Sequence, residues 1–274
     1  MGSHDNSGSG ELTVEIPAQR YFKGVLENKT IFLAKEAPFT LFVNDREILS
    51  ISTLPTHLKE LFVGFLVSEG VLVSPDELLE CHIDNAARLV RMELDVPEER
   101  IERISGTEKK GMLTSGCAGG MIFSVEVAAS PVERKRKPLK VRCSTIVERM
   151  RELHNYPGTY SITRGVHAAA LADSSGIIMI LEDLGRHNAV DKIAGHCFLN
   201  RIETQDKLLL STGRITSEVL TKAARSDFPI IISRSSASSM AVAMARQSHI
   251  DVVTYVRADR FNYFSHSGAE LVEG

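Results

Sequence analysis

Short apolar runs alternate with amphipathic stretches along the second half of the chain, and this alternation constrains the fold more than any other feature. Each apolar run has the length of a strand, and most are followed by a stripe of apolar residues at helical spacing. This order predicts a largely parallel sheet covered by helices. The fold class expected is α/β, with a mixed or parallel sheet and helices on both faces. The predicted strands are 167–171, 177–181, 207–211, 229–233 and 252–256, and the predicted helices are 188–198, 216–225 and 238–247.

The first half predicts a smaller α+β domain. Three β-rich runs lie between residues 30 and 52, and Asn44-Asp45 marks a tight turn between two of them. Apolar residues at helical spacing then predict a helix over 58–66, and Ser74-Pro75-Asp76-Glu77 has the pattern of a capping box. Further strands are expected at 88–96 and 121–127, and Thr145 is expected to cap a short helix.

Three segments are expected along the chain. Residues 1–10 are rich in Gly and Ser and are interpreted as a disordered tail. Residues 11–135 form the N-terminal domain and residues 136–274 the larger α/β domain, with a boundary that could lie as early as residue 111. The basic run Glu133–Arg142 holds six basic residues against one acidic residue, and is interpreted as a solvated linker or as a basic rim that meets phosphates.

Composition excludes several classes of protein. A chain that is 43% hydrophobic is not disordered throughout. A formal net charge of -3 argues against an extended nucleic-acid interface, and no run of about 18 apolar residues is available to span a membrane. The four cysteines form no C-x-x-C pair and follow no secretory signal, so the expected compartment is the cytoplasm, where thiols stay reduced.

Polar loops that follow three of the predicted strands are candidates for a ligand site. They are Glu182–Asn188, Ser211–Arg214 and Arg257–Asn262, and each carries arginine. Ligands of such sheets collect at loops beyond the carboxyl ends of the strands, and helix N-termini and arginine both suit phosphate. Any one loop alone is more typical of ordinary caps and turns. Together they predict a ligand that bears phosphate or a nucleotide. The phosphate candidates are Arg186, Arg214, Arg257 and Arg260, with His187 beside them, and Asp259 or Asp183 is a candidate acceptor for guanine N–H groups.

A glycine-rich loop around Cys117 is the candidate reactive centre. In Thr114-Ser115-Gly116-Cys117-Ala118-Gly119-Gly120, glycines allow backbone N–H groups to surround a thiolate and lower its pKa. The alternative is a core cysteine, which fits Cys143 and Cys197 better because both lie in apolar contexts.

Common cofactor signatures are missing from the sequence. No phosphate-binding P-loop, no dinucleotide G-x-G-x-x-G after a strand and no H-E-x-x-H occurs. A zinc deaminase needs H-x-E followed by a cysteine pair, but Ala169 stands where that glutamate would be after His167. No metal site is therefore predicted.

Several longer strings resemble the formate dehydrogenase accessory proteins, the FdhD-type sulfurtransferases. They are LPTHLKELFVGFLVSEGVL (54–72), GVHAAAL (165–171), EDLGRHNAVDKIAG (182–195), STGRITSE (211–218) and VRADRFNYF (256–264), which together span nearly all of the chain after the tail. The resemblance implies a cytidine-deaminase-like fold and a homodimer. It also implies transfer of persulfide sulfur from a cysteine desulfurase to a molybdenum (or tungsten) bis(molybdopterin guanine dinucleotide) cofactor for formate dehydrogenase.

The same resemblance assigns residues. The persulfide-bearing position matches Cys117, and the guanine-dinucleotide contact segment matches Tyr255, Val256, Arg257, Ala258, Asp259 and Arg260. Many members carry a second cysteine three residues after the first, where this chain has Gly120. A one-thiol mechanism stays open because exchange needs one thiolate. The alternatives are a non-catalytic chaperone that binds the molybdenum cofactor and docks on the dehydrogenase and, from fold analogy alone, a nucleobase deaminase.

Overall fold

The larger unit of the molecule is built around a six-stranded sheet. The computed structural model describes residues 12–105, 138–264, 266 and 268–273, together with the backbone of residues 112–113 and 121–122. The strands of this sheet lie in the order β11-β10-β12-β13-β14-β15. Their bounds are β10 (His167–Ala172), β11 (Ile177–Asp183), β12 (Leu208–Ser211), β13 (Ile230–Ser233), β14 (Asp251–Thr254) and β15 (Asn262–Phe264). The pairs β12–β13 and β13–β14 are parallel and the other three are antiparallel, so the sheet is mixed. The α/β fold class is confirmed, but the largely parallel sheet predicted from the element order is wrong, because β10 and β15 join the sheet antiparallel to their neighbours.

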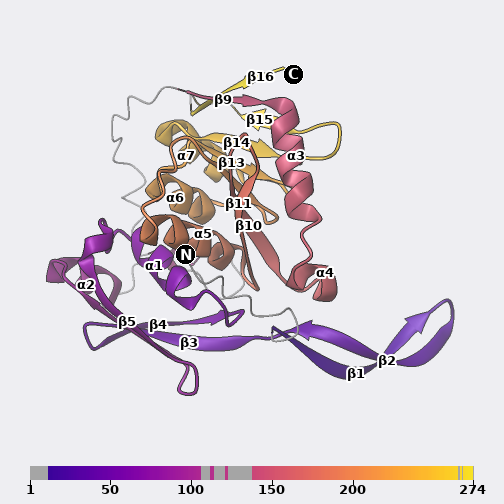
Figure 1. Ribbon diagram of the computed structural model, residues 1–274, viewed down its shortest axis with the longest axis horizontal. Helices are drawn as coiled ribbons and strands as arrows, with labels where there is room; N and C mark the ends of the chain where they lie inside the picture. The colour runs from indigo at the N-terminus through magenta and orange to yellow at the C-terminus, as the bar shows by residue number, and fades with distance from the viewer. Residues whose placement is uncertain are drawn as a thin grey trace.

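Helices cover both faces of this sheet, as predicted (Figure 1). On one face lie α5 (Arg186–Leu199), α6 (Ser217–Arg225) and α7 (Ser239–Ser248), and on the other lies α3 (Cys143–His154). Successive strand residues point to opposite faces. Leu209 and Ile231 therefore join the core under α5, α6 and α7, whereas Leu210 and Ile232 join the core under α3.

Two helices begin earlier than the sequence predicts. Asn188 was expected to cap a helix, but α5 begins at Arg186 with Gly185 as its N-cap. The Asn188 side chain instead donates to the Ser52 backbone oxygen (3.1 Å) and to Asp183 (2.8 Å), which makes it a contact between distant segments. Thr145 likewise lies inside α3, which begins at Cys143 directly after a strand.

A four-stranded sheet with the order β4-β3-β6-β5 forms the N-terminal unit. Its elements are β3 (Ala37–Val43), β4 (Arg46–Thr53), β5 (Leu78–Asp84), β6 (Leu89–Leu94), α1 (Leu58–Ser68), α2 (Glu98–Ser105) and the 3-10 turn η1 (Pro75–Glu77). The predicted turn at Asn44-Asp45 is confirmed, since both residues have positive φ. The predicted capping box is also present, with Ser74 and Glu77 each accepting from the backbone.

The remaining elements lie at the margins. A hairpin of β1 (Thr13–Phe22) and β2 (Val25–Ala34) projects from the body, and α4 (Thr159–Thr163) packs at its base. At the opposite end β9 (Leu139–Arg142) pairs with β16 (Ala269–Val272), so the linker interpretation of the basic run is wrong for residues 139–142. The short strands β7 (Met112–Leu113) and β8 (Met121–Ile122) pair with each other. Because most of residues 106–137 lie outside the described part, the predicted domain boundary stays a prediction.

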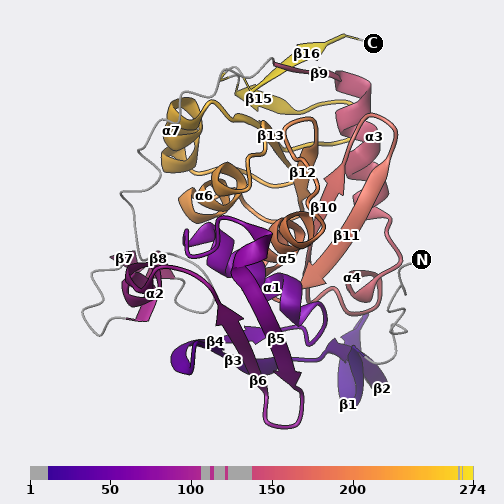
Figure 2. The ribbon, with the colours of Figure 1, turned by 60° about the vertical axis from the view of Figure 1, so that its left-hand side comes forward.

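Two buried ion pairs hold α1 and the end of β4 against the large sheet (Figure 2 shows α1 lying on α5). Lys192 and Asp183 are fully buried, with Nζ 2.7 Å from Oδ2. The Lys192 ammonium also donates to the backbone oxygens of Leu54 and Glu182, so its three protons all have partners. Lys222 lies 2.8 Å from Asp191 and donates to Ser68 of α1. Burial lowers the pKa of Lys192 and raises the pKa of Asp191, and in each case the paired ion opposes the shift.

Helices α1 and α5 cross with their backbones in contact. A Cβ at Gly64 would lie 1.9 Å from the Asp191 carbonyl oxygen, and a Cβ at Gly195 would lie 1.9 Å from that of Glu60. No side chain fits at such a distance, so both positions require glycine. Gly64 of the 54–72 string and Gly195 of the 182–195 string are therefore explained by helix packing.

We expect Gly195→Ala to destabilise the fold by about 1–3 kcal/mol. Helix propensity alone would favour alanine by about 1 kcal/mol, but the added methyl group collides with backbone that cannot rotate away. Thermal or urea unfolding measures the difference. Gly165→Ala is the matched control, because its nearest neighbour would lie 3.6 Å away at ordinary contact distance. A Gly195→Ala protein as stable as the wild type would show that the two helices do not pack in this way.

Candidate functional site

Four strands of the large sheet end at the same edge. The strands β11, β12, β13 and β14 run in one direction, because β10 is antiparallel to both of its neighbours and the rest are parallel. The loops after them, which begin at residues 184, 212, 234 and 255, therefore lie together. This is the edge at which the sequence predicts a ligand site, and the predicted convergence of three of these loops is confirmed.

A pocket of about 510 Å³ opens at this edge. It lies where the four loops meet the end of α3, the helix α4 and the start of β10. Its polar and aromatic lining consists of His154, Tyr156, Tyr160, Arg164, His167, Glu182, Thr212, Arg234, Ser235, Tyr255 and Arg257. A pocket of this size accommodates a nucleotide-sized ligand.

The pocket has a cationic wall. Arg164, Arg234 and Arg257 all line it, and the Arg257 Nη1 donates to the Arg234 backbone oxygen (2.7 Å), which fixes one guanidinium beside the next loop. Burial lowers the pKa of His154, and the guanidinium groups of Arg234, Arg164 and Arg257 lower it further. An anion bound among these groups would reverse that effect and favour the imidazolium. The wall therefore suits phosphate.

Aromatic side chains also line the pocket. Tyr156, Tyr160 and Tyr255 line it, and the Arg164 guanidinium lies 5.0 Å from the Tyr160 ring centre. Tyr255 is about half exposed and has positive φ (54°), a conformation that turns the chain sharply after β14. Exposed aromatic faces beside arginines are suited to stacking on a nucleobase.

Glu182 supplies the carboxylate of the pocket. It accepts hydrogen bonds from the backbone N–H groups of Thr159 (2.6 Å) and Tyr160 (2.9 Å), and so holds the start of α4. Its charge also raises the pKa of Tyr156, although burial is the larger cause. Glu182 therefore fixes the position of Tyr160.

His167 and Thr212 connect the start of β10 to the loop after β12. The Thr212 hydroxyl lies 3.3 Å from His167 Nδ1 and accepts a hydrogen bond from the Ala168 backbone N–H (3.0 Å). Burial lowers the pKa of His167, and the nearby Arg186 adds to the shift, so the ring is held in its neutral form. This residue lines the pocket as a neutral polar group.

The predicted guanine-dinucleotide segment lies only partly at the pocket. Tyr255 and Arg257 line it, whereas the Val256 side chain is buried in the core under α3. Ala258, Asp259 and Arg260 are exposed in the turn that follows, where the Arg257 N–H donates to the Arg260 backbone oxygen (2.9 Å).

The other predicted contacts lie apart from the pocket lining. Arg186 is buried at the start of α5, with Gly213 packed directly on its stem. His187 Nε2 lies 2.7 Å from Glu218 Oε2, and this pair joins α5 to α6. Arg214 is exposed. Asp183 is wrong as a guanine acceptor, because its fully buried carboxylate is occupied by internal partners. Those partners are Thr53, Leu54, Gly185, Asn188 and Lys192.

Cys117 and its glycine-rich loop lie outside the described residues, so its assignment stays a prediction. Burial raises the pKa of Cys197 to about 12, which leaves that thiol unreactive at neutral pH. Burial also raises the pKa of Cys81, and Cys143 is half-buried at the first turn of α3. The interpretation of Cys197 as a core cysteine is confirmed.

Several pocket residues were not found from the sequence. Arg234 follows β13 as Arg257 follows β14. Its place in a loop after a predicted strand could therefore have identified it as a candidate from the sequence. Arg164 and His154 had no such signal, because they come from the helix side of the pocket and reach it only through the packing of α3 and α4.

Within the part of the chain that the structure describes, no three His, Cys, Asp or Glu side chains converge as metal ligands. Among those same residues, no helix has the length and apolar character needed to cross a bilayer.

Comparison with known proteins points to one family. The sequence model of the FdhD/NarQ family matches residues 34–270. The chain is 33% identical over 247 residues to the sulfur carrier protein FdhD of Bacillus subtilis (strain 168), an alignment that covers 90% of this chain and 93% of that protein. It is 34% identical over 256 residues to the protein of the same name from Staphylococcus aureus (strain MRSA252), with 93% and 96% covered. The crystal structure of a formate dehydrogenase accessory protein from Desulfotalea psychrophila superposes with a TM-score of 0.73 at 26% identity, covering 93% of this chain and 97% of that one.

Proposed function

The chain belongs to the FdhD/NarQ family, and from that premise we propose that it is a sulfur carrier that serves formate dehydrogenase. It takes sulfur from the persulfide of a cysteine desulfurase, and it works in the cytoplasm, where its thiol stays reduced. It delivers the sulfur to a molybdenum bis(molybdopterin guanine dinucleotide) cofactor, which it binds as cargo. The names of its relatives support the sulfur carrier and the link to formate dehydrogenase.

The pocket at the sheet edge is the observation that carries the cargo assignment. Each guanine dinucleotide end of the cofactor presents a diphosphate and a purine. Arg164, Arg234 and Arg257 offer charge-assisted hydrogen bonds to the diphosphate. Tyr160 and Tyr255 offer aromatic faces to the purine. The pocket therefore offers groups that bind both the diphosphate and the purine of one guanine dinucleotide.

Cys117 is the proposed sulfur acceptor. Its thiolate attacks the outer sulfur of the donor persulfide, so that a new S–S bond forms, the old one breaks and the donor cysteine leaves as a thiolate. Cys117 then carries a persulfide. Its outer sulfur passes to the metal as sulfide, and Cys117 returns to a thiolate. This step consumes two electrons, which two cellular thiols supply as they join in one disulfide.

Isothermal titration with GDP tests the pocket. GDP reproduces the purine and the diphosphate without the pterin. We expect Arg257→Ala and Arg234→Ala each to weaken GDP binding by about 10- to 100-fold, the usual loss for one hydrogen bond to a charged group. Arg246→Ala is the control, because Arg246 is exposed on α7 and is not among the residues that line the pocket. Unchanged GDP affinity in both pocket variants would refute this site.

A further inference from the structure

Glu182 is the one acidic side chain among the described residues that line the ligand pocket. It is the next-to-last residue of β11, the edge strand of the large sheet. Each of its carboxylate oxygens accepts one backbone hydrogen bond, Oε2 from Thr159 (2.6 Å) and Oε1 from Tyr160 (2.9 Å). Two such bonds, one to each oxygen, hold the carboxylate in one orientation. The pocket therefore contains a hydrogen-bond acceptor that is fixed before any ligand binds.

This carboxylate can accept further hydrogen bonds from a ligand. A carboxylate offers about four lone-pair sites, and the two backbone N–H groups occupy two of them. Its neighbour Asp183 differs, because that side chain is fully buried and its oxygens are occupied by partners within the protein. Glu182 is only half-buried and faces the pocket. Successive residues of a strand point to opposite faces, which gives the two carboxylates their different surroundings.

The order of the strands separates Glu182 from two of the arginine loops. Arg234 follows β13 and Arg257 follows β14, which are the third and the fourth strand counted from β11. Neighbouring strands lie about 4.8 Å apart, so these loops begin roughly 14–19 Å from the end of β11. Arginine side chains that reach back across the pocket leave a distance that an extended nucleoside diphosphate can span. A nucleotide with its diphosphate at Arg234 and Arg257 therefore has its base toward Glu182.

Aromatic rings lie on the same side of the pocket as this carboxylate. Burial raises the pKa of Tyr156, and the charge of Glu182 raises it further, so the two side chains are close together. Tyr160 carries one of the N–H groups that Glu182 accepts. A purine that stacks on the Tyr160 ring therefore has its edge beside the carboxylate.

We propose that Glu182 selects guanine over adenine in this pocket, an inference that rests on the proposed function. The Watson–Crick edge of guanine carries two donors, the N1–H and the 2-amino group, and a carboxylate only accepts. The same edge of adenine presents N1 as an acceptor, whose lone pair a carboxylate repels. The arginines bind the diphosphate of either nucleotide, and the tyrosines stack on either purine. Glu182 is the group that distinguishes the two bases.

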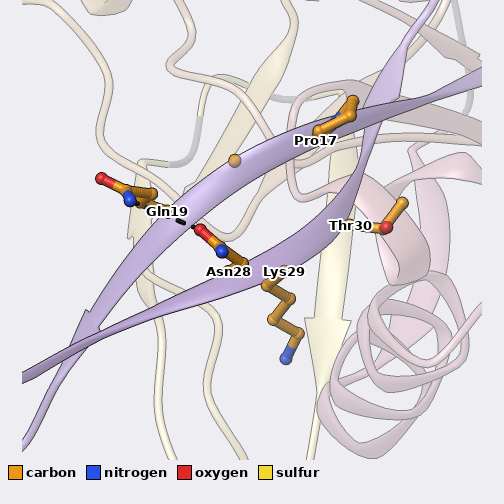
Figure 3. A pocket seen from close by; sticks show the side chains of 6 residues that line it. Pro17, Gln19, Asn28, Lys29 and Thr30 are labelled. Carbon is orange, nitrogen blue, oxygen red and sulfur yellow. Dashed lines mark hydrogen bonds between the residues drawn. The ribbon is translucent and has the colours of Figure 1, made fainter.

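A second hollow in the molecule lacks this combination of groups. It lies on the β1–β2 hairpin and has a volume of about 500 Å³. Figure 3 shows its lining, which consists of Pro17, Ala18, Gln19, Asn28, Lys29 and Thr30. Gln19 donates to Asn28 across the strands (3.3 Å). These described lining residues include no carboxylate and no aromatic ring, so the hollow offers guanine neither an anionic acceptor nor a stacking face.

Isothermal titration with GDP and with ADP tests the proposal. Wild-type protein is expected to bind GDP at least about 100-fold more tightly than ADP. Glu182→Gln keeps one oxygen for a backbone N–H but loses the charge and one acceptor. It is expected to weaken GDP binding by about 10- to 100-fold and to leave ADP binding unchanged or tighter, so that the two affinities converge. A purely structural role of Glu182 would weaken both nucleotides by the same factor and keep their ratio.

Two variants serve as controls for the affinity ratio. Tyr255→Ala is expected to weaken GDP and ADP by similar factors, because stacking does not read the edge of the base. Asp206→Asn makes the same acid-to-amide change at an exposed carboxylate outside the pocket lining, and is expected to keep both affinities.

Three results would overturn the proposal while the pocket assignment stands. They are equal binding of GDP and ADP by the wild type, a wild-type affinity ratio in Glu182→Gln, and a ratio that is lost in Asp259→Asn but kept in Glu182→Gln. A wild-type protein that binds neither nucleotide would overturn the proposed cargo site and this proposal together.

Discussion

Asp183→Ala is expected to lower the free energy of unfolding by about 3–5 kcal/mol, a large share of the stability of a typical domain. Asp183 is fully buried and is the counter-ion of Lys192, which is also fully buried. Removing the carboxylate leaves an ammonium in the interior with backbone oxygens as its remaining partners. It also leaves the N–H groups of Leu54 and Gly185 without their acceptor. Urea unfolding measures the loss.

Two further variants identify the cause of that loss. Asp206→Ala removes an exposed carboxylate that pairs with Lys207 and is expected to cost no more than about 1 kcal/mol. Asp183→Ala/Lys192→Met removes both buried charges, so it is expected to be more stable than Asp183→Ala alone. If Asp183→Ala unfolds at the same urea concentration as Asp206→Ala, Asp183 and Lys192 are not a buried pair and the contact between the two units is different.

The sequence string Glu182–Gly195 most strongly marks the resemblance to the family, and most of its charged residues stabilise the fold rather than line the pocket. Within Glu182–Gly195, the charged residues Asp183, Arg186, Asp191 and Lys192 are all buried. Sequence patterns predicted a phosphate loop here, because polar residues after a strand are typical of one. They could not show that Asp183 binds Thr53, which is 130 residues away along the chain. Only Glu182 and Leu184 of this string line the pocket.

Strands and helices with buried apolar faces could be predicted well from periodicity. The runs at 207–211, 229–233 and 252–256 correspond to β12, β13 and β14 within one or two residues. Helix starts were less predictable, since the N-cap of α5 is Gly185, which has no side chain to accept a capping hydrogen bond and so leaves no cap signal in the sequence. The strand β1 was missed because its alternation of apolar Val14 and Ile16 with polar residues stops at Pro17, and most of the strand is exposed.

Only some of the pocket residues could be predicted from the sequence, because tertiary packing places the others. Its loops follow strands, and the common direction of those strands brings Thr212, Arg234 and Arg257 to one edge. The other half comes from α3, α4 and the start of β10, whose position depends on tertiary packing. Nothing local in the sequence around Arg164 or His154 indicates a ligand.

Cys117→Ala is expected to abolish sulfur uptake. The proposed exchange forms an S–S bond at this thiol, and an alanine side chain has no sulfur with which to form it. Cys197 is buried with its pKa raised to about 12, and burial also raises the pKa of Cys81. Cys143→Ala and Cys197→Ala are therefore the matched controls, and both are expected to accept sulfur as the wild type does.

Mass spectrometry of the intact chain after incubation with a persulfide donor tests the central claim most directly. The account predicts a gain of one sulfur atom in the wild type, in Cys143→Ala and in Cys197→Ala, with the added sulfur mapped to the peptide that contains Cys117, and no gain in Cys117→Ala. Equal sulfur uptake by Cys117→Ala would contradict the account. So would a wild-type chain that gains no sulfur while it still binds GDP, because a cofactor chaperone without a sulfur step would then explain the pocket.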